Sequence, residues 1–283
     1  MAALRLTVLG SGTSMGVPTL GCSCPVCCSQ DPRDQRTRSS VLLEAEGRNV
    51  VIDTTPDFRA QALRERLRRL DAVVYTHGHA DHILGLDDIR PFNIRQKSKI
   101  PLYASPDTLA VLRRTFAYIF EDPMTPSSTL PGIHLNPIDG PFDPFGVPGR
   151  KIEMLPVPAQ HGPIEVLGFR VGRLAYLTDF SSIPEESKAL LADLDDLILR
   201  DLLDAGRTAP ALLRKGKIHA DGDDLHLVSR PNASLLDPAG DDRHVHALAG
   251  QLLHVGRAPR PQGQLHGDDG VGVRGLDPPP GRP

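Results

Sequence analysis

His77-Gly78-His79-Ala80-Asp81-His82 places four side chains that can bind a metal ion within six residues, directly after the apolar run 72–75. Three of the 11 histidines of this 283-residue chain fall in the hexapeptide, which argues against a surface loop with chance histidines. Imidazole and carboxylate together suit a zinc, iron or manganese site that keeps positions open for water. Histidines two apart at a strand end point to one side, and the next two ligand types follow at the turn. The hexapeptide therefore predicts a metal-dependent hydrolase whose short loop serves two adjacent ions.

Around this loop, short β-rich runs alternate with helical patterns. The residue pattern predicts strands at 4–9, 41–43, 49–52, 72–75, 152–157, 166–171 and 174–177. It predicts helices at 58–70, 106–119 and 184–191. This alternation is typical of a mixed α/β layered domain.

The helix predicted at 58–70 is rich in arginine, which leaves a nucleic-acid-binding face open as an alternative. Its apolar positions Ala62, Leu63, Leu67 and Leu70, with the stem of Arg66, fit one buried stripe beside a solvated basic side. We favour this second interpretation and predict no nucleic-acid partner.

The composition gives no global attraction to nucleic acid or to anionic membranes, because the formal net charge is −3 and the pI is about 6.4. The N-terminal apolar run is too short for a signal peptide, and no segment approaches the roughly 18 apolar residues of a spanning helix. We therefore expect a cytoplasmic protein with a small-molecule substrate and no membrane partner. The sequence is also compatible with a homodimer.

All four cysteines lie in one short stretch, Cys22-Ser23-Cys24-Pro25-Val26-Cys27-Cys28. Such close packing suits thiolates that converge on a metal ion better than disulfides that join distant segments. Two further candidate ligands follow predicted strands: His161 lies after 152–157, and Asp179 lies after 174–177. Each is weak evidence alone, and their order behind the hexapeptide is what makes them candidates.

That order, His-x-His-x-Asp-His followed by His161 and Asp179, resembles the metallo-β-lactamase superfamily over residues 4–199. Within it, four segments are similar to the branch that contains phosphoribosyl 1,2-cyclic phosphate phosphodiesterases, the PhnP-like branch. These segments are Leu9–Pro18, Gly21–Cys27, Asp57–Arg59 and Gly85–Asn93.

The resemblance implies a four-layer αββα sandwich with two divalent ions, zinc or manganese, at one edge of its two sheets. It implies that one ion is held by His77, His79 and His161, the other by Asp81 and His82, and that Asp179 bridges both. A hydroxide between the ions would attack the phosphorus of a small phosphate diester. Asp81 is then both ligand and catalytic residue, since its loss should abolish hydrolysis.

Asp53 follows the predicted strand 49–52 and either orients a ligand histidine from behind or is a simple turn carboxylate. The same branch also implies a structural zinc bound by Cys22, Cys24 and Cys27, with a histidine near the C-terminus as fourth ligand. Cys28 is extra, because four thiolates in seven residues can hardly all reach one tetrahedral ion.

The sequence departs from the family after about residue 200. Residues 201–283 contain no Phe, Tyr, Met, Cys or Glu and a single Ile, and the Thr-His-x-x-His element of the family is absent. We therefore predict a hydrolase domain over 1–199, truncated at its C-terminal end, and a low-complexity tail over 200–283. The tail is expected to be disordered, and a shifted reading frame is the simplest explanation for it.

Three functions stay open. The first is a metal-dependent phosphodiesterase acting on a small cyclic phosphate ester, which the cysteine loop favours. The second keeps the fold but changes the chemistry, to a tRNA 3′-processing nuclease or to a thioester or lactone hydrolase; no RNA-binding arm is evident. The third is a metal-binding but catalytically silent relative.

Overall fold

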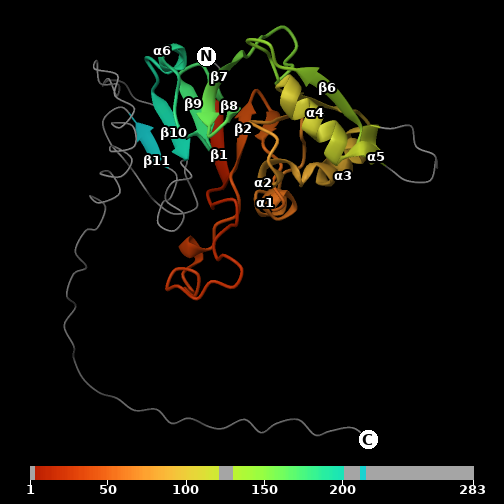
Figure 1. Ribbon diagram of the computed structural model, residues 1–283. Helices are drawn as coiled ribbons and strands as arrows, with labels where there is room; N and C mark the ends of the chain where they lie inside the picture. The colour runs from red at the N-terminus through yellow and green to blue at the C-terminus, as the bar shows by residue number, and fades with distance from the viewer. Residues whose placement is uncertain (1–3, 121–129, 201–210, 215–283) are drawn as a thin grey trace, which may run out of the picture.

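Two β-sheets pack face to face between outer layers of helices in the computed structural model (Figure 1), which describes residues 4–120, 130–200 and 211–214. The first sheet contains six strands in sequence order: β1 (Leu4–Gly10), β2 (Ser40–Ala45), β3 (Arg48–Ile52), β4 (Ala72–Val74), β5 (Ile100–Ala104) and β6 (Ile133–Pro137). The pairs β1–β2 and β2–β3 are antiparallel, whereas β3 to β6 run parallel. The carboxyl ends of β3 and β4 therefore lie at the same sheet edge.

The second sheet has the strand order β11-β10-β9-β8-β7. Its strands are β7 (Met154–His161), β8 (Ile164–Val171), β9 (Leu174–Thr178), β10 (Asp196–Arg200) and β11 (Ala211–Arg214). β7, β8 and β9 form an antiparallel meander, β10 lies parallel to β9, and β11 pairs antiparallel with β10. The sequence did not predict β11, which extends the sheet past residue 199. The remaining residues after 200 lie outside the described part of the chain.

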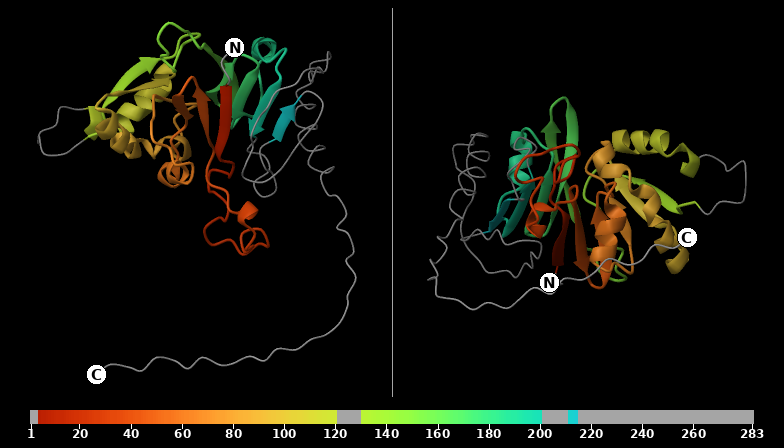
Figure 2. Two further views of the ribbon diagram at one scale, coloured as in Figure 1. Left: turned by 180° about the vertical axis from the view of Figure 1, so that it is seen from behind. Right: turned by 90° about the horizontal axis from the view of Figure 1, so that it is seen from below.

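The helices cover the outer faces of both sheets (Figure 2). The first sheet carries α1 (Phe58–Arg64), α2 (Ala80–Ile83), α3 (Arg90–Gln96), α4 (Pro106–Thr115) and α5 (Ala117–Phe120), together with the 3-10 turn η2 (Leu86–Ile89). The second sheet carries α6 (Glu185–Leu190) and its flanking apolar residues. A further 3-10 turn, η1 (Pro32–Asp34), belongs to the long loop that projects beyond β1.

Strand periodicity explains why both faces of the first sheet are apolar. In β4, Ala72 and Val74 join the cluster between the sheets, whereas Val73 packs among the helices, and all three are fully buried. The cluster between the sheets also contains Phe169 and Tyr176 of the second sheet. The predicted four-layer αββα sandwich is therefore confirmed.

Helix α1 is shorter than the sequence predicted, and the cause is a left-handed residue. Arg66 has φ 52°, and the N–H of Leu67 donates to the carbonyl of Ala62 at 2.9 Å, which closes the helix with a Schellman motif. The predicted buried stripe is wrong at Leu63, whose side chain is 61% exposed. Within the described residues, no helix is long and apolar enough to cross a membrane.

Candidate metal centre

The ligand candidates stand at strand ends on one edge of the sandwich. Asp53 follows β3, His77 lies three residues after β4, and His161 ends β7, while Asp179 comes directly after β9. The short helix α2 begins at Ala80, carries Asp81 and His82, and has His79 as its N-cap residue. Because parallel strands share a carboxyl edge and the two sheets pack face to face, residues far apart in the sequence meet there.

Three imidazoles form a first group: the ligand nitrogens of His77, His79 and His161 lie within 4.8 Å of one another. Nε2 of His77 is 3.0 Å from Nδ1 of His79. Two nitrogens bound to one zinc ion at roughly 2.0–2.1 Å would be about 3 Å apart, so this spacing fits a shared ion. The three donors match the ligand set that was expected for the first ion.

A second group contains His77, His82 and Asp179, all buried. Nε2 of His82 lies 2.6 Å from Oδ2 of Asp179, and Nε2 of His77 lies 4.0 Å from the same oxygen. Asp81 is adjacent, with Oδ2 3.3 Å from Nε2 of His82. The six expected ligands are thus brought together, and His77 belongs to both groups.

Asp53 lies behind this cluster and is fully buried. Its Oδ2 is 2.7 Å from Nδ1 of His82, on the side of the ring away from Asp179. Its Oδ1 accepts the backbone N–H of Thr76 at 2.9 Å. These contacts favour an orienting role over a simple turn carboxylate.

The protein environment separates the charge states of the histidines. Burial, with the nearby charge of His82, lowers the pKa of His77 to about 3, and burial and His161 lower the pKa of His79. Burial alone would also lower the pKa of His82, but Asp53 and Asp179 raise it well above its ordinary value. His77 and His79 are therefore neutral, with the lone pairs that metal binding requires.

Sequence reasoning missed one residue of this centre, Thr76. Its side chain is buried, and its hydroxyl lies 2.8 Å from Oδ2 of Asp53 and 3.0 Å from Nδ1 of His77. Its place directly before the hexapeptide was the one available signal, because the contacts to Asp53 depend on the pairing of β3 with β4.

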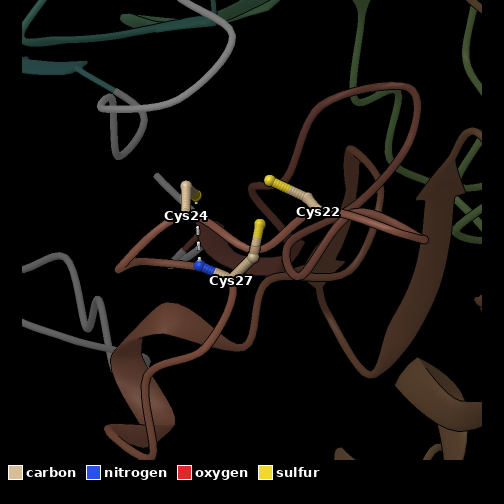
Figure 3. Close-up of side chains that lie close together, drawn as sticks. All are labelled: Cys22, Cys24 and Cys27. Atoms are coloured by element: carbon tan, nitrogen blue, oxygen red, sulfur yellow. Dashed lines mark hydrogen bonds between the residues drawn. The ribbon is translucent and has the colours of Figure 1, made fainter.

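A separate cysteine cluster lies in the loop between β1 and β2 (Figure 3). The sulfur atoms of Cys22, Cys24 and Cys27 lie within 4.8 Å of one another. The backbone N–H of Cys27 donates to Sγ of Cys24 at 3.4 Å, and that of Thr19 donates to Sγ of Cys27 at 3.3 Å. Cys28 does not join the cluster. The donor set therefore fits a zinc ion with three thiolates from this loop.

The electrostatics of the loop support thiolate formation at one position. The backbone N–H of Cys27 is the largest cause that lowers the pKa of Cys24 to about 7, and the side chains of Cys22 and Cys27 add to it. Among the described residues, no histidine completes this trio. The histidines after residue 200 lie outside the described part of the chain.

The αββα sandwich and the His/Asp cluster at its edge define a metallo-β-lactamase type of protein. A family model described as a beta-lactamase superfamily domain matches residues 48–239, and the chain belongs to that superfamily. A solved structure described as a new diphosphatase from the PhnP family is 49% identical, with a TM-score of 0.62, and the match covers 69% of this chain and 73% of that one.

Two curated relatives carry names that describe different activities. An octanoyltransferase of Porphyromonas gingivalis is 40% identical over 184 residues, which is 65% of this chain but 36% of the relative. Coenzyme PQQ synthesis protein B of Methylobacterium radiotolerans is 27% identical over 69% of this chain and 72% of the relative. Because the chain spans about a third of the octanoyltransferase, the activity of that whole protein is not transferred to it.

Proposed function

We propose that this chain is a metal-dependent phosphodiesterase that hydrolyses a small, cyclic phosphate ester at the His/Asp cluster. The observation that carries the proposal is the pair of ligand groups that share His77, with Asp179 beside both. Two divalent ions held by such adjacent groups would suit phosphoryl transfer, where charge develops on both the attacking and the leaving oxygen. The 49% identity to a structure described as a PhnP-family diphosphatase supports a phosphorus-centred hydrolysis, though of a diphosphate in that protein.

The residues would act as two ligand sets around one substrate position. His77, His79 and His161 would hold one divalent ion, zinc or manganese, and Asp81 and His82 the other, with Asp179 between them. Divalent ions at such a cluster act as Lewis acids on phosphoryl oxygens and lower the pKa of bound water. His82 would be oriented by Asp53, whose carboxylate lies on the far side of its ring.

Asp81 is the residue through which the proposal is best tested. Its side chain is 17% exposed, more than those of its neighbours His77 and His82, and it contacts the cluster at its solvent side. Burial acts to raise the pKa of Asp81, but the neighbouring His82 outweighs it and lowers the pKa below its ordinary value. Asp81 is therefore ionised at neutral pH and available as a ligand.

Hydrolysis of a diphosphate bond is a second candidate, because the similar PhnP-family structure is described as a diphosphatase. Both kinds of substrate carry phosphoryl oxygens that the same two ions would polarise; the leaving group is an alkoxide in the ester and a phosphate in the diphosphate. The two kinds of substrate differ in shape. Comparing their rates of hydrolysis therefore separates the two candidate functions.

The test is a rate measurement on the purified full chain with added manganese or zinc. Substrates are bis(p-nitrophenyl) phosphate, a ribose 1,2-cyclic phosphate and a dinucleoside diphosphate. We expect hydrolysis of the cyclic diester that EDTA abolishes, and loss of at least about 100-fold in Asp81→Ala, the range for removing a metal-ion contribution of several kcal/mol. Full activity of Asp81→Ala, with unchanged metal content, would contradict the proposal. A preference for the diphosphate would establish the second candidate instead.

A further inference from the structure

We propose that Thr76 is a positioning residue that fixes the orientation and tautomer of His77 and, through Asp53, of His82. The inference rests on the metal centre of the proposed function. It adds a residue that contacts no reacting group and that acts through two ligand histidines at once.

The first step concerns the direction of the hydrogen bonds. The backbone N–H of Thr76 donates to Oδ1 of Asp53 at 2.9 Å, and the Thr76 hydroxyl lies 2.8 Å from Oδ2 of the same carboxylate. A hydroxyl has one hydrogen, and beside a carboxylate oxygen it donates that hydrogen. Nδ1 of His82 is 3.5 Å from this hydroxyl but only 2.7 Å from Asp53, so the lone pairs of the Thr76 hydroxyl are left for its nearer neighbour.

That neighbour is Nδ1 of His77, 3.0 Å from the hydroxyl oxygen. Since the hydroxyl can act only as an acceptor there, Nδ1 of His77 carries the proton. A neutral imidazole has one N–H, so Nε2 keeps its lone pair. Nε2 is the atom that faces His79 and Asp179, where a metal ion would bind.

The same carboxylate fixes the second ring. Nδ1 of His82 lies 2.7 Å from Oδ2 of Asp53, the oxygen that also accepts from Thr76. Nε2 of His82 then points at Asp179, 2.6 Å away. Oδ2 of Asp53 thus connects the hydroxyl of Thr76 with the ring of His82, while the same hydroxyl contacts the ring of His77. Both ligand groups therefore depend on one chain of hydrogen bonds.

Thr76 could instead fill space as one of several buried threonines, and the neighbouring Thr54 separates the two roles. Thr54 is also fully buried, and its hydroxyl contacts the hydroxyl of Tyr75, which is not a ligand candidate. Replacing either threonine by valine removes one buried hydroxyl at nearly constant volume. The Thr76 variant alone should change metal binding if the hydrogen-bond chain is what matters.

The experiment compares Thr76→Val, Thr76→Ser and Thr54→Val in the full chain, using zinc as the probe. Zinc affinity is measured by competition with a chelator, and the tautomers are read from the ring nitrogen signals of ¹⁵N-histidine in the metal-free protein. We expect Thr76→Val to bind zinc at the histidine cluster roughly 10- to 100-fold more weakly. Thr76→Ser should restore affinity, and Thr54→Val should retain it despite a similar loss of stability. In Thr76→Val the signals of His77 should show a mixture of tautomers.

The proposal is overturned if Thr76→Val binds zinc as tightly as the unmodified chain, or if Thr76→Ser fails to restore affinity. It is also overturned if Thr54→Val weakens zinc binding as much as Thr76→Val. Failure of the proposed function gives a different result, because the unmodified chain would then bind zinc at its histidine cluster but hydrolyse no phosphate ester.

Discussion

Asp53 and Asp179 lie on opposite sides of the His82 ring, with Oδ2 of one 2.7 Å from Nδ1 and Oδ2 of the other 2.6 Å from Nε2. Both aspartates have positive φ, 64° and 56°, a conformation that aspartate tolerates better than most residues. Each follows the last residue of a strand. Both carboxylates therefore reach His82 from left-handed residues at strand ends.

Replacing Asp53 by Asn should weaken metal binding without disturbing the backbone, because asparagine also tolerates positive φ. The amide would keep one acceptor for the N–H of Thr76 but would place a donor against Nδ1 of His82. His82 must then carry its proton on Nε2, which removes the lone pair toward the metal. We expect roughly 10- to 100-fold weaker zinc binding in a chelator competition. Unchanged affinity would show that Asp53 has no orienting role.

A glycine just after α2 should tolerate no side chain. A Cβ on Gly85 would lie 2.1 Å from the carbonyl oxygen of Thr55 and 2.9 Å from Cβ of Phe58. Gly85→Ala should therefore destabilise the protein by about 1–3 kcal/mol or more and shift α2 with its ligands. The matched control is Gly140→Ala, where no atom lies within 4 Å and the change should stay within about 0.5 kcal/mol. Urea unfolding measures the free energy of unfolding of both variants. Equal values for Gly85→Ala and Gly140→Ala would refute the steric argument.

The carboxylate of Asp71 should make stability depend on pH in acid. Burial acts to raise the pKa of Asp71, but Arg69, the N–H of Asn49 and Arg48 outweigh it and lower the pKa. A depressed folded-state pKa gives stability that is present above the unfolded value and lost as pH falls through the folded value. Asp71→Asn should thus cost about 1–3 kcal/mol at pH 7. The difference in unfolding free energy between Asp71→Asn and the unmodified chain should shrink as the pH falls below about 3.9, the ordinary pKa of aspartate.

Urea unfolding at pH 7, 5 and 3 checks this window. Glu44→Gln is the control, since Glu44 pairs with Arg5 at a half-exposed site and its loss should cost about 0–1 kcal/mol. A gap between Asp71→Asn and the unmodified chain that stays constant down to pH 3 would mean that the charge of Asp71 contributes nothing.

The cysteine loop should bind zinc through three of its four thiols. Cys24→Ser should abolish this zinc, whereas Cys28→Ser should leave it, because Cys28 lies outside the cluster of sulfur atoms. With three protein ligands, the ion should be completed by water and released readily to a chromogenic chelator. Zinc that resists the chelator in the unmodified chain would show that a fourth ligand from outside the described residues reaches the loop.

The ligand cluster could be predicted from the sequence because its signal is local. Four candidate ligands occupy six residues, His161 ends β7, and Asp179 directly follows β9. Thr76 could not be predicted, since its role depends on a carboxylate 23 residues away. Strands β5 and β6 were missed for a different reason: Pro101 lies inside β5 and Pro137 is the last residue of β6, and proline is disfavoured in strands.

The hypothesis of a shifted reading frame concerns residues 200–283, most of which lie outside the described part of the chain. The family match continues to residue 239, past the point where the composition changes. Translation of the gene in all three frames after codon 195 remains the direct test. Recovery of a Thr-His-x-x-His element in another frame would support the hypothesis.

The ligands come from both halves of the molecule: His77 and His82 follow a strand of the first sheet, whereas His161 and Asp179 follow strands of the second. Each ion would then bind residues of both sheets, and its binding free energy would add to the docking of one sheet on the other. If the chain is divided at the exposed Gly149 between β6 and β7, the two fragments should associate with higher affinity when zinc is supplied.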